Sequence, residues 1–214
     1  IEAIGEFHRF DPMEVIATAE ETRALLARHA DKPFLLFPED RRFPIRMAND
    51  LPLRWIELGP RDALDGEAQR DEWYPFQIGV FAARQALEDV QVAFTDLRPQ
   101  GRGRAIPAAA LRCINLGGTD WAGRPFRKTV SVPKDAVQAL WCGVQIPRDA
   151  KPGLYHSTVT VSAKGVAPQQ IALHLAVSQE VAEDHGDGDL WRYTRLRWLD
   201  STIGLDDAAV PPFT

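Results

Sequence analysis

Two alternating segments joined by a turn, between residues 134 and 161, constrain the fold of this chain more than any other feature. In each segment the apolar side chains fall on one face, and these are Leu140, Cys142, Val144 and Ile146 in the first and Tyr155, Val159 and Val161 in the second. A period of two is typical of strands in a sheet with one buried and one solvated face. Pro152 and Gly153 favour a chain reversal between the segments. We therefore predict a hairpin within a β-sandwich.

Further short apolar runs, separated by turn residues, extend this pattern along the chain. They lie at residues 34–37, 74–82, 90–94, 111–116, 126–132 and 171–177. Residues 45–47 and 53–56 suggest brief edge strands interrupted by prolines, and residues 60–69 suggest a polar loop. Eight or more short strands at regular spacing are typical of an antiparallel sandwich. Thr18 and Glu21 have the spacing of a capping box, which predicts a short helix over residues 19–29.

The fold class predicted from these patterns is all-β, an antiparallel β-sandwich with a short N-terminal helix and a C-terminal extension. Residues 1–32 are expected to be a lead-in with the helix, residues 33–178 the sandwich, and residues 179–214 a loop and an Arg/Trp strip leading to a next domain. The sequence begins at Ile1 rather than at a methionine. We therefore expect a fragment of a longer protein.

The composition argues against several classes of partner. Thirty acidic against 25 basic residues give a net charge of −5, whereas a nucleic-acid surface needs clustered excess lysine and arginine. No apolar stretch approaches the roughly 20 residues of a membrane span. We expect no cofactor and no metal site. Cys113 and Cys142 each lie in a predicted strand and are interpreted as two buried thiols or, alternatively, as a disulfide between neighbouring strands.

The carboxylate pairs of the chain do not suggest a catalytic centre. A glycosidase needs two carboxyl groups on either side of a sugar, whereas adjacent residues on a strand point to opposite faces. We interpret all the pairs as solvated turn residues, and these are Glu39-Asp40, Asp71-Glu72, Glu88-Asp89, Glu183-Asp184 and Asp206-Asp207. The acidic run 184–189 is interpreted as a flexible loop, with a calcium site as the alternative.

Two aromatic segments are candidates for contact with a ligand or a partner. Trp121 lies in a glycine-rich loop with Asp120 and Arg124, where an indole could stack on a sugar ring and the charged groups could bond hydroxyls. The alternative is that Trp121 covers the end of the sandwich. Near the C-terminus, Arg and Trp alternate in a predicted strand. We interpret this strand as an interdomain docking strip or, alternatively, as a patch that binds an acidic glycan. Its residues are Trp191, Arg195, Arg197 and Trp198.

Four strings, taken in order, carry a resemblance to a known family. They are PFLLFPED at residues 33–40, EWYPFQIGVFA at 72–82, the predicted hairpin at 130–161, and WRYTRLRWLDSTI at 191–203. This order resembles the N-terminal region of large bacterial proteins related to glycoside hydrolase family 123, and the likeness covers nearly the whole chain. The resemblance implies a β-sandwich that precedes a (β/α)₈ barrel. In that family the barrel carries an adjacent Asp-Glu pair and cleaves with the help of the substrate's own 2-acetamido group.

The resemblance implies that this chain is the ancillary sandwich of such an enzyme and has no catalytic pair of its own. Its expected partners are a downstream catalytic domain of the same chain and possible glycan, and its expected location is secreted or periplasmic. Two other functions remain open from the sequence. One is an independent carbohydrate-binding module, and the other is a sandwich that binds a protein partner.

Overall fold

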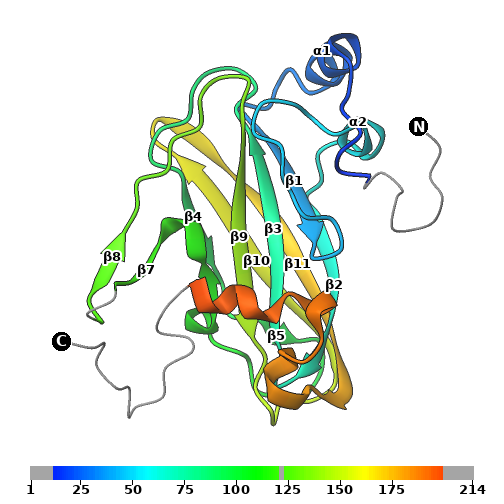
Figure 1. The fold of residues 1–214 in the computed structure, drawn as a ribbon, viewed down its shortest axis with the longest axis vertical. Coiled ribbons are helices and arrows are strands. Elements are labelled where there is room, and N and C mark those ends of the chain that lie inside the picture. Colours follow the sequence, from blue (N-terminus) through cyan, green and yellow to red (C-terminus); the bar gives the residue numbers. More distant parts are fainter. Residues whose placement is uncertain (1–11, 121–122, 200–214) are drawn as a thin grey trace.

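Two packed sheets form the body of the molecule, which confirms the predicted all-β sandwich (Figure 1). The computed structural model describes residues 12–120 and 123–199. The first sheet is antiparallel and has the order β1 (Leu35–Asp40), β3 (Trp73–Phe81), β9 (Val137–Gln145) and β6 (Leu111–Cys113). The second sheet has the order β2 (Ala63–Arg70), β11 (Val166–Val181), β10 (Gly153–Ala163) and β4 (Gln91–Phe94), and β5 (Arg98–Pro99) also pairs with β10. Within it, β2 and β11 run parallel.

The main core lies between the two sheets. The apolar faces predicted from the alternation are buried there. Leu140 and Val144 on β9 and Ile146 directly after it are fully buried. On β10, the buried residues of the predicted face are Tyr155, Val159 and Val161. His156 on the opposite face of β10 is exposed. Period-two alternation thus identified the buried face of both strands correctly.

The predicted hairpin between residues 134 and 161 is wrong in one respect, because β9 and β10 do not pair. β9 lies between β3 and β6 in the first sheet, and β10 lies between β11 and the β4–β5 edge in the second. Both edges of each strand are therefore occupied by other partners. The turn at residues 146–152 carries the chain from one sheet to the other, and Gly153 takes a φ of +144° as β10 begins.

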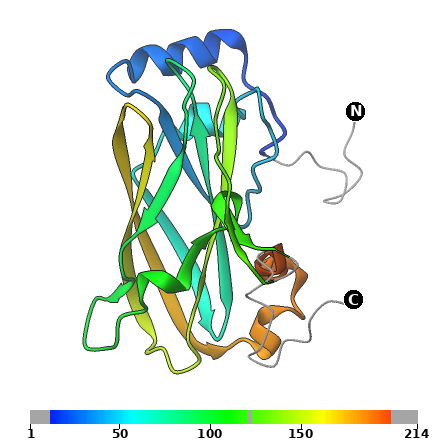
Figure 2. The same ribbon diagram turned by 90° about the vertical axis from the view of Figure 1, so that its left-hand side faces the viewer.

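Two helices pack against one end of the first sheet, on the face opposite the main core. Figure 2 shows the longer of the two lying across that end of the sandwich. α1 (Ala19–Arg28) begins at the predicted capping box, in which Thr18 and Glu21 each accept a hydrogen bond from the other's backbone amide. α2 (Leu53–Leu58) occupies residues where we expected an edge strand. Pro52 is its N-cap residue, in an extended conformation that suits proline. Trp55 of α2 packs into a second core with Phe37 and Leu25.

Three other segments differ from the expectations. Residues 60–69 contain most of β2 rather than a polar loop, with Leu64 and Ala68 buried, and residues 45–47 form no strand. The glycine-rich loop is flanked by a small hairpin of β7 (Gly117–Thr119) and β8 (Pro125–Arg127). Short 3-10 turns, η2 (Ala108–Ala110) and η3 (Ile114–Leu116), flank β6. Among the described helices, none combines the length and apolar character that crossing a membrane requires.

Candidate functional site

The C-terminal segment folds into three 3-10 helices rather than the strand that its Arg/Trp alternation suggested. They are η4 (Glu183–Gly186), η5 (Leu190–Arg192) and η6 (Thr194–Leu199), and η6 contacts β3 of the first sheet. Asp189 caps η5 by accepting a hydrogen bond from the amide of Trp191, and Tyr193 between η5 and η6 takes a left-handed φ of 54°. A left-handed backbone conformation at Tyr193 is incompatible with a continuous extended strand. Figure 2 shows the segment near the end of the sandwich opposite α1.

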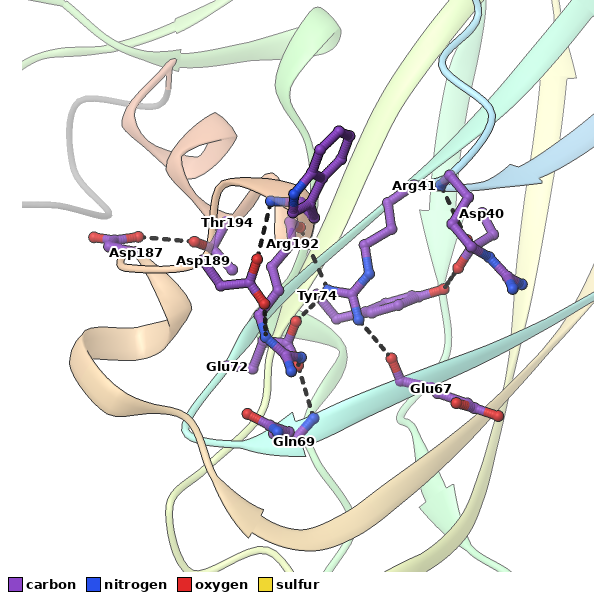
Figure 3. Close-up of polar contacts among 12 residues, drawn as sticks. Asp40, Arg41, Glu67, Gln69, Glu72, Tyr74, Asp187, Asp189, Arg192 and Thr194 are labelled. Carbon is purple, nitrogen blue, oxygen red and sulfur yellow. Dashed lines mark hydrogen bonds and ion pairs between the residues drawn. The ribbon is translucent and has the colours of Figure 1, made fainter. Parts of the chain in front are cut away.

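Glu72, directly before β3, anchors this segment to the sandwich (Figure 3). Its side chain is fully buried. One carboxylate oxygen is paired with Arg41, and the other lies 3.1 Å from Nη1 of Arg192 and accepts a hydrogen bond of 2.7 Å from the amide of Gln69. Arg41 also donates to the carbonyl oxygen of Arg192 at 3.3 Å. One carboxylate therefore joins the first sheet to the C-terminal segment.

Arg41 extends the network toward Tyr74 and Asp40. Its guanidinium lies 5.0 Å from the centre of the Tyr74 ring and donates to the carbonyl oxygen of Glu67 at 2.9 Å. The Tyr74 hydroxyl donates to Asp40 at 2.8 Å. Burial, followed by the neighbouring Asp40 charge, raises the pKa of Tyr74, so the phenol stays protonated. Burial acts to raise the pKa of Asp40, but hydrogen bonds from Arg42 and Tyr74 outweigh it and hold that pKa below its ordinary value.

The prediction that the carboxylate pairs are solvated turn residues is therefore wrong for three of their members. Glu39, Asp40 and Glu72 are all buried. A buried carboxylate is tolerated when charged and polar donors occupy its oxygens. No short-range pattern revealed these partners, because Glu72 lies 31 residues from Arg41 and 120 from Arg192.

A second ion pair closes the C-terminal segment on itself. Asp187 is paired with the Arg197 guanidinium and accepts a hydrogen bond from the Thr194 hydroxyl at 2.8 Å. Arg197 and Thr194 are buried. The bond from Arg197 lowers the pKa of Asp187, although partial burial opposes that effect. Two acidic residues of the predicted flexible loop, Asp187 and Asp189, are thus engaged by arginines.

Apolar side chains on the outer side of this segment form an exposed surface. Trp191 is 81% exposed and Trp198 54% exposed, and both were predicted contact residues. The segment supplies five of the ten large hydrophobic side chains that are exposed in the described residues. We call these five the C-terminal aromatic surface, and they are Leu190, Trp191, Tyr193, Trp198 and Leu199. A hollow of about 390 Å³ opens between Leu190, Tyr193, Leu196 and Leu199. Most of this apolar area has no cover in the described chain.

The four residues predicted for docking are divided between the two sides of the segment. Trp191, Trp198 and Arg195 lie on its exposed side, and the Arg195 guanidinium lies 5.5 Å from the centre of the Trp198 ring. Arg197 is only 6% exposed and is engaged with Asp187. Arg197 therefore holds the segment in shape, and the other three face outward.

The glycine-rich loop holds the second set of predicted residues. Trp121 lies outside the described residues. Asp120 accepts hydrogen bonds of 2.9 Å from both the amide and Nε of Arg124. Gly123 takes a φ of +78° in this turn and donates to the carbonyl oxygen of Asp120. Asp120 and Arg124 therefore bond each other and close the loop.

A groove of about 390 Å³ runs beside this loop, between β4 and the β7–β8 hairpin. Its lining includes aromatic, cationic and amide side chains, namely Phe94, Phe126, Arg112, Arg127 and Gln91. Phe126 is 39% exposed. Arg127 donates to the Gln91 side chain at 2.6 Å, which ties the hairpin to β4. Flat rings beside hydrogen-bonding groups can accommodate a polar ring ligand.

Comparison with known proteins finds a match to a family model and several similar solved structures. The model of the glycoside hydrolase 123 N-terminal domain matches residues 121–163. The structure of a family 123 glycoside hydrolase from Clostridium perfringens is similar at 15% identity with a TM-score of 0.53, over 71% of this chain and 28% of that one. This chain thus spans little more than a quarter of that enzyme's length. No curated protein matches the chain.

Other solved structures share less of the fold. A PapD-like domain of human CEP192 has 12% identity and a TM-score of 0.33, with 57% of this chain and 84% of that one covered. The secreted serine protease VesC from Vibrio cholerae has 9% identity and a TM-score of 0.33, with 53% and 21% covered. The family-model match over residues 121–163 supports the resemblance noted in the sequence, a relation to the N-terminal domain of glycoside hydrolase 123 proteins, and the Clostridium perfringens enzyme contains a similar fold.

Proposed function

We propose that this chain is a non-catalytic accessory domain of a multi-domain glycoside hydrolase, and that it braces the catalytic domain through the C-terminal aromatic surface. The observation that carries the proposal is an exposed apolar surface on a segment fixed by buried ion pairs. Trp191 and Trp198 are exposed, while Arg192 and Arg197 beside them are bonded to Glu72 and Asp187. A preorganised aromatic surface loses little conformational entropy on docking. Tryptophan and tyrosine are also enriched among residues that dominate interfaces.

The family relation supports the identity of the partner. In this proposal the partner is a catalytic domain of the same chain, and the whole protein acts in the periplasm or after secretion. Three buried carboxylates of the chain, Glu39, Asp40 and Glu72, are committed to arginine, tyrosine or tryptophan donors. The proposal therefore assigns support to the sandwich and the chemistry to its neighbour.

The test is a double substitution, Trp191→Ala with Trp198→Ala, in the multi-domain protein and in the isolated chain. In the isolated chain we expect the free energy of unfolding to change by no more than about 0.5 kcal/mol, because both indoles are already exposed. In the multi-domain protein we expect a loss of roughly 2 kcal/mol or more of interdomain coupling, seen as a lower Tm and faster proteolysis between the domains. Phe126→Ala is the control, since Phe126 is exposed on a different surface. If the double variant and this control give the same Tm and the same rate of proteolysis between the domains in the multi-domain protein, the bracing role is contradicted.

A second candidate function is glycan contact at the groove beside the β7–β8 hairpin. The observation that favours it is the combination of Phe94 and Phe126 with arginine and glutamine side chains along one opening. We expect chemical-shift changes when the isolated chain is titrated with an oligosaccharide panel, including sugars that carry a 2-acetamido group. Phe126→Ala and Trp121→Ala should each weaken binding, by about 1–3 kcal/mol for a stacked ring. A panel that produces no shift and no heat would exclude this function for the isolated chain.

A further inference from the structure

The two cysteines of the chain face each other across neighbouring strands. Cys113 ends β6 and is the direct register partner of Cys142 in β9. Both carry free thiols, and the Cys142 side chain is hydrogen-bonded to that of Cys113. Directly opposed residues of an antiparallel pair have Cα atoms about 4.5 or 5.5 Å apart. A disulfide accepts Cα separations of roughly 4.4–6.8 Å, so the backbone can hold the bond without moving far.

The two thiols differ in access and in acidity. Cys113 is half-buried and lines the groove beside the β7–β8 hairpin, whereas Cys142 is only 2% exposed. The hydrogen bond from Cys142 lowers the pKa of Cys113, and the amides of Asn115 and Leu116 act in the same direction against the effect of burial. Burial raises the pKa of Cys142. The accessible sulfur is thus the better nucleophile, and a second thiol lies within its reach.

We propose that Cys113 and Cys142 are a redox-active pair that closes to a cross-strand disulfide when the protein meets a disulfide oxidant such as oxidised glutathione. The Cys113 thiolate attacks one sulfur of the oxidant, whose S–S bond breaks and releases one glutathione thiolate. Cys142 then loses its proton and attacks the Cys113 sulfur, which releases the second glutathione thiolate. The protein loses two electrons and two protons, and the oxidant becomes two thiols.

The position of the pair gives this bond a structural consequence. β6 contains only three residues and is followed by η3 and the β7–β8 hairpin, which contributes Phe126 to the groove. The disulfide would join β9, an inner strand of the first sheet, covalently to the strand from which η3 and the β7–β8 hairpin extend. The inference does not depend on the accessory role, because it rests only on the register and exposure of the two thiols.

The test is to equilibrate the chain in buffers of defined reduced and oxidised glutathione, to alkylate the remaining thiols in denaturant, and to measure the intact mass. We expect the doubly alkylated form to be replaced by a species that lacks two hydrogens and carries neither alkyl group nor glutathione. Closing the loop of residues 113–142 should also raise Tm by roughly 5–10 °C. Retention of both thiols under excess oxidised glutathione would overturn the proposal.

Two variants separate the roles of the thiols. With Cys142→Ala, a stable glutathione adduct should accumulate on Cys113, because no second thiol resolves it. With Cys113→Ala, Cys142 should stay reduced over the same range, because it is buried. A wild-type chain that accumulates the adduct as Cys142→Ala does would show that the pair fails to close. The wild-type measurement needs no substitution, so it decides the matter even if a variant folds poorly.

Discussion

Glu72 combines complete burial with full use of its two carboxylate oxygens, and the link to the C-terminal segment depends on this residue. Arg41, Arg192 and the amide of Gln69 together surround it. The arginine side chains are themselves only 13% and 24% exposed. Removing one member of a buried ion pair leaves the remaining charges without solvent or partner, which costs more than the pair contributes.

Glu72→Gln is therefore expected to destabilise the chain by about 3 kcal/mol, near the lower end for a broken buried pair. The measurement is the free energy of unfolding from urea denaturation. Glu88→Gln is the matched control, because Glu88 and Lys164 are exposed and 3.7 Å apart, and such a pair contributes at most about 1 kcal/mol. Similar values for the two variants would show that the Glu72 network is not a stabilising anchor.

Asp187 should make the order of the C-terminal segment depend on pH. Its pKa is lowered in the folded chain by the bond from Arg197. A lowered folded-state pKa means that the stabilisation is complete above the ordinary value near 3.8 and is lost as the pH falls through the folded value. We expect amide protection across residues 187–199, corrected for intrinsic exchange rates, to fall over that window. In the Asp187→Asn variant this amide protection should be lower at neutral pH and should not fall over that window. Parallel curves of protection against pH for the variant and the wild-type chain would refute the assignment.

At the scale of the elements, helix α2 is fixed to the first sheet by one tryptophan. The Trp55 ring stacks on Phe37 with centroids 4.3 Å apart, and its Nε1 donates to Glu39 at 2.9 Å. The ring also lies directly over Gly79 of β3, where an added Cβ would come within 2.3 Å of it. The absence of a side chain at position 79 is thus what allows the helix to approach the sheet.

Gly79→Ala is expected to force Trp55 out of this position and to cost about 1–3 kcal/mol, as overpacking does in other cores. Urea denaturation measures the loss, and near-ultraviolet circular dichroism reports the displaced indole. Gly101→Ala serves as the control, because an added Cβ at position 101 meets nothing within 4 Å, and its effect should stay within about 0.5 kcal/mol. If the two alanine variants are equally stable, the close packing of Trp55 on β3 is not a constraint.

These elements also show what the sequence could predict. The buried faces of β9 and β10 follow from alternation, because side-chain direction in a strand is a local property. Their assignment to different sheets depends on which edges the other strands occupy, and that is a property of the whole chain. α2 was expected to be a strand because a segment as short as residues 53–56 has no clear period. Glu72 was missed as an anchor because its arginines come from distant segments.

At the scale of the whole molecule, two separate cores share the first sheet. The core between the sheets contains most of the buried apolar side chains, whereas the second core lies between the outer face of the first sheet and the two helices. β1 and β3 are buried on both faces for this reason. A helical layer with a smaller buried area should open at a lower free energy than the sandwich beneath it.

Leu25 and Leu173 allow this order of opening to be tested, because both are completely buried and lie in different cores. Each change to alanine should cost about 2–5 kcal/mol, but the two should act on different amides in native-state hydrogen exchange. We expect Leu25→Ala to reduce protection in α1 and α2 and to leave the β10–β11 amides nearly unchanged, because the helices open without the sheets. Leu173→Ala should reduce protection in every element, because it weakens the core on which both sheets depend. If Leu25→Ala lowers the protection of β10 and β11 as much as that of α1, the helices and the sandwich unfold as one unit.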